Sequence, residues 1–75
     1  MNEYSFTIVL EREEEGGYHA FCPALQGCHT QGETYEKTLE NIKDAIKIYL
    51  ESLQAHRENI PSEEDITIKP VRVTV

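Results

Sequence analysis

The chain reads Gly16-Gly17-Tyr18-His19-Ala20-Phe21-Cys22-Pro23 and then, from residue 25, Leu25-Gln26-Gly27-Cys28-His29-Thr30-Gln31-Gly32. The two adjacent glycines permit positive φ, which is typical of a hairpin connection. Tyr18 to Cys22 has the pattern of a returning strand, and Pro23 stops it because proline has no amide proton to donate to a ladder. Residues 28–31 are long enough for a brief third strand that Gly32 closes. These two segments therefore predict a hairpin, a short strand and a tight turn.

The segment before the hairpin alternates apolar and polar residues. Tyr4, Phe6, Ile8 and Leu10 recur at every second position, which is the period of a half-buried strand. The run Glu13-Glu14-Glu15 then ends the pattern, and three adjacent like charges are tolerated only where water solvates them. We therefore expect a first strand over residues 4–11 and an acidic hairpin tip in solvent.

One long amphipathic helix is predicted after Gly32. Thr34 suits the N-cap position, because its hydroxyl can accept a hydrogen bond from a free amide of the first turn. His56 falls in the last turn, where a cation is favoured by the helix dipole. The apolar stripe, which repeats at spacings of four and three, consists of Tyr35, Leu39, Ile42, Ile46, Tyr49 and Leu53. Both tyrosines of this stripe are therefore expected in the core.

The end of the chain predicts a polar connection and a final strand. Residues 54–65 are polar and contain Pro61, and residues 66–75 read Ile-Thr-Ile-Lys-Pro-Val-Arg-Val-Thr-Val. Pro70 favours an edge position or a kink between two short segments. The predicted order is thus β-β-β-α-β, an α+β fold with an antiparallel-rich sheet and one long helix packed on one face. We expect a single domain over residues 1–75 with a thin core and free strand edges.

Composition and charge narrow the class of partner. Fourteen acidic residues stand against seven basic ones, a formal net charge of −7. Such a chain repels nucleic-acid phosphates and attracts a basic protein, although the same charge can simply maintain solubility. The first residues lack the pattern of a signal peptide, and no apolar run has the length needed to span a bilayer. We expect no membrane association and a cytoplasmic location in which the two cysteines stay reduced.

Catalytic and metal chemistry find little support in the residue pattern. Metal-dependent phosphodiester hydrolysis needs several converging carboxylates, whereas the acids here gather at the hairpin tip, on the helix exterior and in the connection. His19, Cys22, Cys28 and His29 could in principle hold zinc, but neighbouring strand residues point to opposite faces. Buried thiols and partly exposed imidazoles are the simpler interpretation. We expect no catalytic residues, no metal and no cofactor.

Several features together resemble one known family. They are the Gly16-Gly17-Tyr18 hairpin, the loop from Pro23 to Cys28, the Gln31-Gly32 turn and the helical Asn41-Ile42-Lys43-Asp44-Ala45-Ile46. As a set they look like the N-terminal domain of HicB-type antitoxins. The resemblance implies a partial RNase H-like fold and the binding of a small, basic, RNA-cleaving toxin of the HicA type. It also implies assembly into dimers or larger oligomers.

Many members of that family carry a second, C-terminal domain that binds operator DNA. We expect no such domain in this chain, because neither a helix pair nor a basic cluster follows the last strand. Direct binding of nucleic acid is therefore not expected. Whether residues 71–75 dock in their own subunit or in a neighbour's is left open by the sequence.

The leading functional hypothesis is an acidic antitoxin-like module that neutralises its toxin by masking the active site of that enzyme. Sign complementarity favours acidic contacts, and an amphipathic tyrosine suits an interface. The alternative is an orphan homo-oligomeric domain with a structural or small-ligand role and no toxin. The candidate partner-binding residues are Glu11, Glu13, Glu14, Glu15, Tyr18, Glu36, Glu40 and Asp44.

Overall fold

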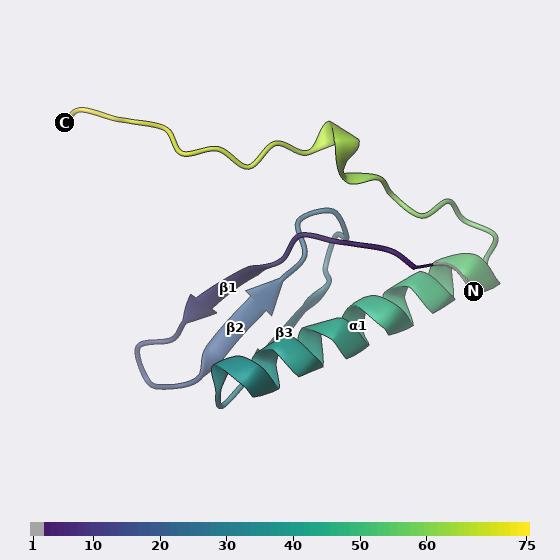
Figure 1. Ribbon diagram of the computed structural model, residues 1–75, viewed down its shortest axis with the longest axis horizontal. Helices are drawn as coiled ribbons and strands as arrows, with labels where there is room; N and C mark the ends of the chain where they lie inside the picture. Colours follow the sequence, from purple (N-terminus) through teal and green to yellow (C-terminus); the bar gives the residue numbers. More distant parts are fainter. Residues whose placement is uncertain (1–2) are drawn as a thin grey trace.

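The structure is a computed structural model that describes residues 3–75. Three strands precede one long helix (Figure 1), and the elements are β1 (Val9–Arg12), β2 (Tyr18–Phe21), β3 (His29–Gly32), α1 (Tyr35–Ala55) and the 3₁₀ turn η1 (Glu63–Asp65). The strands form one antiparallel sheet in the order β1-β2-β3, so each strand pairs with its neighbour in the chain. The predicted α+β class, with an antiparallel sheet and one long helix, is confirmed.

The hairpin between β1 and β2 depends on its two glycines. Gly16 has a φ of 101° and Gly17 a φ of 81°, values in the left-handed region that side chains rarely adopt. The Glu13 amide donates to the Gly17 carbonyl over 2.9 Å, and the Gly16 amide donates to the Glu13 carbonyl over 3.2 Å. A Cβ at Gly17 would also lie 2.9 Å from the carbonyl oxygen of Gly32 on β3. Both positions therefore favour glycine for their positive φ. At Gly17 a side chain would also collide with the backbone of β3.

Both ends of α1 are capped as the sequence predicts. The Thr34 hydroxyl accepts a hydrogen bond from the Lys37 amide over 3.0 Å, which satisfies one of the free amides of the first turn. At the other end, the amide of His56 donates to the Ser52 carbonyl, and its Nδ1 lies 2.8 Å from the same oxygen. Among residues 3–75 no helix combines the length and the apolar character needed to cross a membrane.

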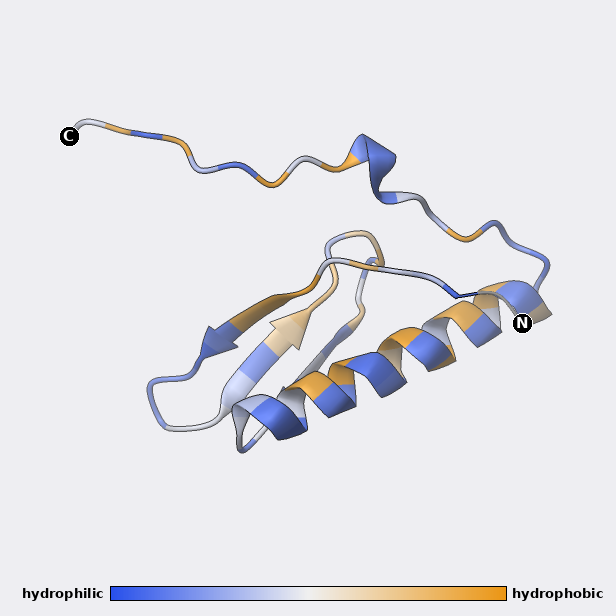
Figure 2. Ribbon diagram, in the orientation of Figure 1, coloured by the Kyte–Doolittle hydropathy of each residue, from blue (hydrophilic) through white to orange (hydrophobic). Residues whose placement is uncertain are grey.

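The core is one layer thick and lies between the sheet and α1. Ala20 on β2 and Ile42 on α1 are completely buried and face one another across this layer. Figure 2 shows the apolar stripe of α1 turned toward the strands and its polar face turned outward. The residues that complete the core are Cys22, Leu25 and Cys28, with Phe6, Ile8, Leu10, Leu39, Ala45, Ile46, Tyr49 and Leu50 partly buried around them.

One member of the predicted stripe lies outside this core. Tyr35 is 51% exposed, so its predicted core position is wrong, whereas Tyr49 packs against the core as expected. The position facing the end of β3 is taken instead by Thr38, which is fully buried. A Cβ added at Gly32 would lie only 2.5 Å from the Thr38 hydroxyl oxygen. The backbone of β3 therefore approaches α1 too closely for an aromatic side chain to lie between them.

The predicted last strand is not part of this sheet. Residues 66–75, which we call the arm, are extended, yet no hydrogen bond joins residues 67–75 to any other described part of the chain. Figure 1 shows the arm running apart from the three strands. A β-strand needs hydrogen bonds to a partner strand, and residues 66–75 make none to the sheet in this structure. Likewise, β1 begins at Val9 because residues 4–8 extend past the end of β2, where no partner strand faces them.

Candidate functional site

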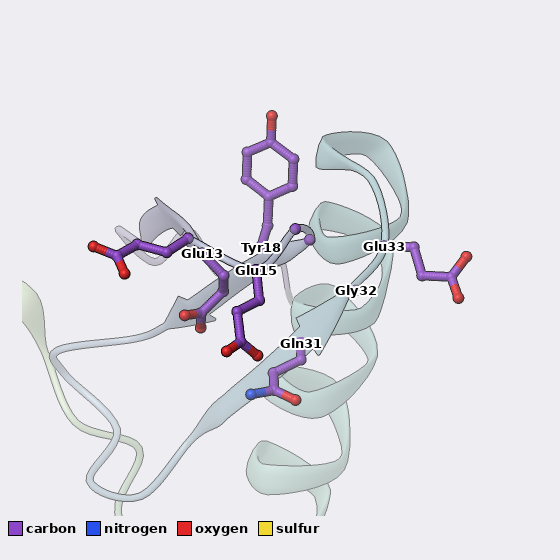
Figure 3. A pocket seen from close by; sticks show the side chains of 9 residues that line it. Glu13, Glu15, Tyr18, Gln31, Gly32 and Glu33 are labelled. Carbon is purple, nitrogen blue, oxygen red and sulfur yellow. The ribbon is translucent and has the colours of Figure 1, made fainter.

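An open hollow of about 880 Å³ lies at the hairpin end of the sheet, between the β1–β2 turn and the start of α1 (Figure 3). Four carboxylates and no basic side chain line it. A surface of this kind favours cations, because its like charges reinforce one another and attract the opposite sign. We call it the acidic hollow. Its lining residues are Glu13, Glu14, Glu15, Gly16, Gly17, Tyr18, Gln31, Gly32 and Glu33.

The acidic hollow contains half of the predicted partner-binding residues. The hairpin tip supplies Glu13, Glu14 and Glu15, and β2 supplies Tyr18. Sequence reasoning missed Glu33 as a fourth acid of this group. The signal for it is the strand register, because Tyr18 pairs with Gly32 and so brings the next residue beside the hairpin. That register cannot be read from the linear pattern without knowing how β2 and β3 align.

The other predicted contacts lie on different surfaces. Glu11 pairs with His19 across β1 and β2, and strand alternation puts both on the face opposite Leu10, which packs toward the core. Glu40 lies on the exposed face of α1, where its carboxylate is 3.9 Å from the Lys37 ammonium. Two further acids follow the same helix, Glu36 in the first turn and Asp44 one turn beyond Glu40. The predicted set is therefore divided between the hollow, the outer sheet face and the helix exterior.

An aromatic pair borders the acidic hollow. The rings of Tyr18 and Tyr35 meet edge to face, with centroids 6.1 Å apart and planes at 87°. Figure 3 shows the Tyr18 ring pointing away from the carboxylate of Glu15. The aromatic pair and the carboxylates of the hairpin tip therefore point in different directions at the same end of the sheet, and Glu33 points away from both Glu13 and Glu15 (Figure 3). Tyr18 is partly buried and Tyr35 is 51% exposed, and accessible tyrosines are common anchors in protein interfaces, since they bury a large area at a low cost in side-chain entropy.

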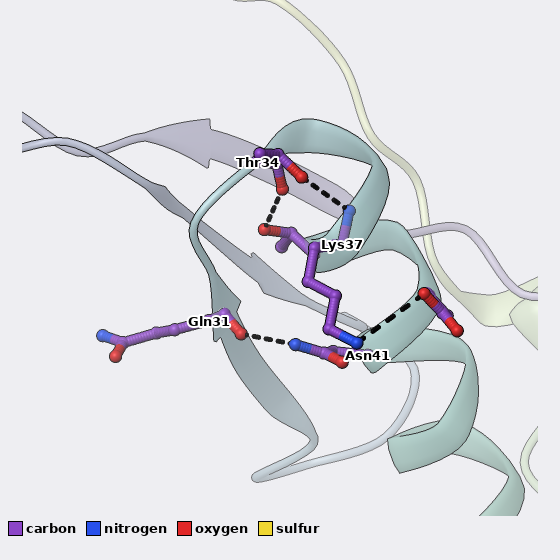
Figure 4. Close-up of polar contacts among 6 residues, drawn as sticks. Gln31, Thr34, Lys37 and Asn41 are labelled. Atoms are coloured by element: carbon purple, nitrogen blue, oxygen red, sulfur yellow. Dashed lines mark hydrogen bonds and ion pairs between the residues drawn. The ribbon is translucent and has the colours of Figure 1, made fainter.

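A small polar network holds the wall of the hollow in place (Figure 4). The Asn41 amide nitrogen donates to the Gln31 carbonyl of β3 over 2.9 Å. One turn earlier, the Thr38 hydroxyl donates to the Thr34 carbonyl over 2.7 Å. The second bond lies within the start of the helix, so the Asn41–Gln31 bond and the close approach at Gly32 are the contacts that join the first two turns of α1 to β3. The side of the hollow formed by Gln31 and Gly32 is therefore held against the helix, whereas its acidic tip belongs to a turn.

The four side chains considered as zinc ligands are divided between the two faces of the sheet. On the outer face the His19 ring lies near both His29 and Phe21, with centroid distances of 5.7 and 6.1 Å. Cys22 and Cys28 are buried in the core as free thiols. Burial raises the pKa of both thiols above the ordinary value, which opposes thiolate chemistry. Within residues 3–75 no three His, Cys, Asp or Glu side chains are close enough together to hold a metal ion.

Comparison with known proteins identifies relatives along most of the chain. A family described as "HicB_like antitoxin of bacterial toxin-antitoxin system" matches residues 6–71. A UPF0150 protein of Synechocystis sp. is 50% identical over 72 residues, which cover 96% of this chain and 90% of that protein. A UPF0150 protein of Thermoplasma acidophilum is 46% identical over 65 residues, 84% of this chain and 94% of that protein. Antitoxin HicB 1 of Photorhabdus laumondii is 38% identical over 56 residues, which cover 75% of this chain and 36% of that longer protein.

Proposed function

The chain belongs to the HicB-like antitoxin family of bacterial toxin–antitoxin systems, and on that premise we propose that it binds and neutralises a small basic toxin of the HicA type. The family assigns the antitoxin role. The identity of the toxin and the masking of its active site are the parts we propose. The observation that carries them is the acidic hollow, which four glutamates and no basic side chain line. The role is one of binding in the cytoplasm, without catalysis by this chain.

The charge of the hollow matches the expected surface of an RNA-cleaving enzyme. Such an enzyme has to bind a polyphosphate, so its active surface carries Lys and Arg. The carboxylates of Glu13, Glu14, Glu15 and Glu33 offer those cations an alternative to phosphate. Charge-assisted hydrogen bonds between carboxylates and Arg or Lys are among the stronger polar contacts in proteins. Occupation of the basic surface by the hollow would then exclude RNA.

The remaining features of the chain support this mode of binding. The net charge of −7 steers a basic partner toward the antitoxin and raises the association rate at low salt. The Tyr18–Tyr35 pair beside the hollow supplies apolar area, which slows dissociation. Under this proposal Glu40 and Asp44, which lie along the outer face of α1, contribute to long-range attraction rather than to direct contacts.

The proposal is tested by charge reversal in two matched places. The first variant carries Glu13→Lys, Glu14→Lys and Glu15→Lys in the hollow, and the control carries Glu40→Lys, Asp44→Lys and Glu51→Lys on the helix exterior. Both change the net charge equally. The partner is the small basic protein encoded beside this chain, and stopped-flow fluorescence gives its association and dissociation rates at several salt concentrations. Both variants should associate more slowly, because both lose long-range attraction, but the hollow variant should dissociate at least ~10-fold faster than the control, because only the hollow makes short-range contacts.

Equal effects of the two triple variants would show that only net charge matters, and would reject the hollow as the docking surface. A chain that retains no basic protein when purified from its own host at low salt would reject the antitoxin–toxin pairing. The orphan-domain hypothesis would then replace it. An inhibited toxin that still binds RNA would contradict the masking mechanism alone.

A further inference from the structure

The loop between β2 and β3 consists of two consecutive tight turns. The Leu25 amide donates to the Cys22 carbonyl over 3.1 Å, and the Cys28 amide donates to the Leu25 carbonyl over 3.0 Å. Each bond joins residues three apart, as in a β-turn. Pro23 suits the second position of the first turn, and Gly27, with a φ of 79°, suits the third position of the second turn, where type II turns require a positive φ. We call residues 22–28 the double turn.

The double turn puts the two cysteines of the chain opposite each other. In the register of β2 and β3, Phe21 pairs with His29, so the next pair along is Cys22 with Cys28. The Cys22 amide donates to the Cys28 carbonyl over 3.0 Å, as this pairing requires. Residues opposed at a hydrogen-bonded position of an antiparallel ladder have Cα atoms about 5.5 Å apart, and disulfides join residues whose Cα atoms are about 4.4–6.8 Å apart.

Both thiols also lie on the same face of the sheet. Strand alternation puts Cys22 on the face of Ala20, which α1 covers, and both cysteines belong to the same buried core cluster as Ala20. Cys22 is 2% exposed and Cys28 6%. Burial raises the pKa of the Cys28 thiol, and the charge of the Cys22 thiolate raises it further, which requires that the two sulfurs lie close together.

The backbone at this pair leaves room for a small adjustment. Opposed Cβ atoms lie about 4.5–5.5 Å apart and a disulfide needs about 3.5–4.5 Å, so the two residues have to approach by roughly 1 Å. A complete hydrogen-bonded pair exchanges two bonds, whereas here the Cys28 amide donates to Leu25 instead of Cys22. Leu25, which is 1% exposed, is the core side chain that the double turn carries. A bond between the two sulfurs would therefore hold Leu25 in the core.

We propose that Cys22 and Cys28 form a reversible disulfide by exchange with a small-molecule disulfide such as oxidised glutathione, and that this bond holds the double turn against the core. The sulfur of Cys28, the more exposed of the two, attacks one sulfur of the small disulfide, whose S–S bond breaks and whose other half leaves as a thiol. Cys22 then attacks the Cys28 sulfur of the mixed disulfide and releases the second half as a thiol. The two cysteines are oxidised by two electrons, and their two protons end on the two released thiols.

The resting state is the dithiol, and its oxidation is slow. Burial raises the pKa of both thiols, so the reactive thiolate is scarce until the double turn opens transiently. The double turn lies at the end of the sheet away from the β1–β2 hairpin (Figure 1), so the bond forms at a distance from the acidic hollow. This inference does not depend on the toxin and goes beyond the proposed function.

Equilibration with mixtures of oxidised and reduced glutathione tests the proposal. The chain is titrated both folded, in buffer, and unfolded, in concentrated urea, and the internal disulfide is recognised by the loss of two hydrogen atoms from the intact mass of the monomer. Only the folded chain holds the thiols opposite each other. Its equilibrium constant for disulfide formation should therefore be at least ~10-fold larger than that of the unfolded chain. An equal or smaller constant in the folded chain would overturn the proposal.

The matched control is the double variant Cys28→Ala, His29→Cys, which moves one thiol by a single position to the outer face of the sheet. In urea this variant should form its disulfide about as readily as the unaltered chain, because the spacing is almost the same. When folded it should do so at least ~10-fold less readily than the unaltered chain, because its thiols point to opposite faces. Equal constants for the two folded chains would also overturn the proposal.

Hydrogen exchange tests the effect of the bond on the double turn. The oxidised chain should keep the circular dichroism of the reduced chain, and its Leu25 amide should exchange at least ~10-fold more slowly, since opening of the double turn now has to move both linked residues. Loss of the folded spectrum on oxidation would show that the bond does not fit this fold. Unchanged exchange at Leu25 would show that it does not hold the double turn. Either result would overturn the inference.

Discussion

Gly32→Ala is the substitution whose effect is most directly determined by the structure. A Cβ at this position would lie 2.5 Å from the Thr38 hydroxyl oxygen, 2.8 Å from its amide nitrogen and 2.9 Å from its Cα. Carbon atoms in proteins do not approach so closely, so β3 and α1 have to separate. Two of the three nearest atoms belong to the helix backbone. Rotation of the Thr38 side chain therefore cannot relieve the contact.

The expected loss of unfolding free energy follows from the contacts that are disturbed when β3 and α1 move apart. Inserting a methyl group into a well-packed site costs about 1–3 kcal/mol. Here the shift also strains the Asn41–Gln31 hydrogen bond, 2.9 Å long, and a bond of this kind contributes about 0.5–1.5 kcal/mol. We expect Gly32→Ala to lower the free energy of unfolding by about 2–4 kcal/mol. This is a large fraction of the stability of a small domain.

Urea unfolding followed by circular dichroism, at one fixed protein concentration, measures this loss. Gly27→Ala is the matched control, because Gly27 has a φ of 79° but nothing within 4 Å of an added Cβ. It should cost only the conformational penalty of about 1–2 kcal/mol. A Gly32→Ala chain that is within about 0.5 kcal/mol of the unaltered one would refute the reasoning, since β3 and α1 would then not be in close contact.

Two further predictions concern pH and the helix–strand hydrogen bond. Burial raises the pKa of the Cys22 and Cys28 thiols in the folded chain, so above the ordinary thiol pKa of about 8.5 the unfolded chain loses protons that the folded chain retains. Stability should therefore fall as the pH rises from that value, and the double variant Cys22→Ala, Cys28→Ala should lose this part of the slope in urea titrations. Asn41→Ala should reduce stability by about 1 kcal/mol, since it leaves a strand carbonyl unpaired, whereas Glu40→Ala, which breaks only an exposed 3.9 Å ion pair, should change it by less than about 0.5 kcal/mol.

Local signals in the sequence predict most of the fold. The Thr34 cap, the apolar stripe and the Gly16-Gly17 turn each depend on residues close together in the chain, so their patterns can be read directly. Thr38 was missed because periodicity counts only apolar residues, while its burial is due to the glycine that faces it on β3. The final strand was predicted from composition alone. Composition shows that residues 66–75 can form a strand, but not where a partner strand would lie.

The candidate site could be predicted only in part. Three adjacent glutamates at a hairpin tip are visible in any linear reading. Glu33 joins them through the pairing of β2 with β3, and strand register depends on the folded geometry. Glu11 and Asp44 have the same charge as the hollow residues but point elsewhere, so residue type alone could not separate them.

The order of the elements has a consequence for the speed of folding. Every strand pairs with the strand next to it in the chain, and α1 follows β3 after only two residues, Glu33 and Thr34. The hairpin, the third strand and the helix can therefore form from neighbouring segments with little loss of loop entropy. Domains dominated by such local pairings have low contact order and reach the native state quickly. Residues 9–55 can complete their structure without residues 66–75, so formation of the acidic hollow does not depend on where the arm binds.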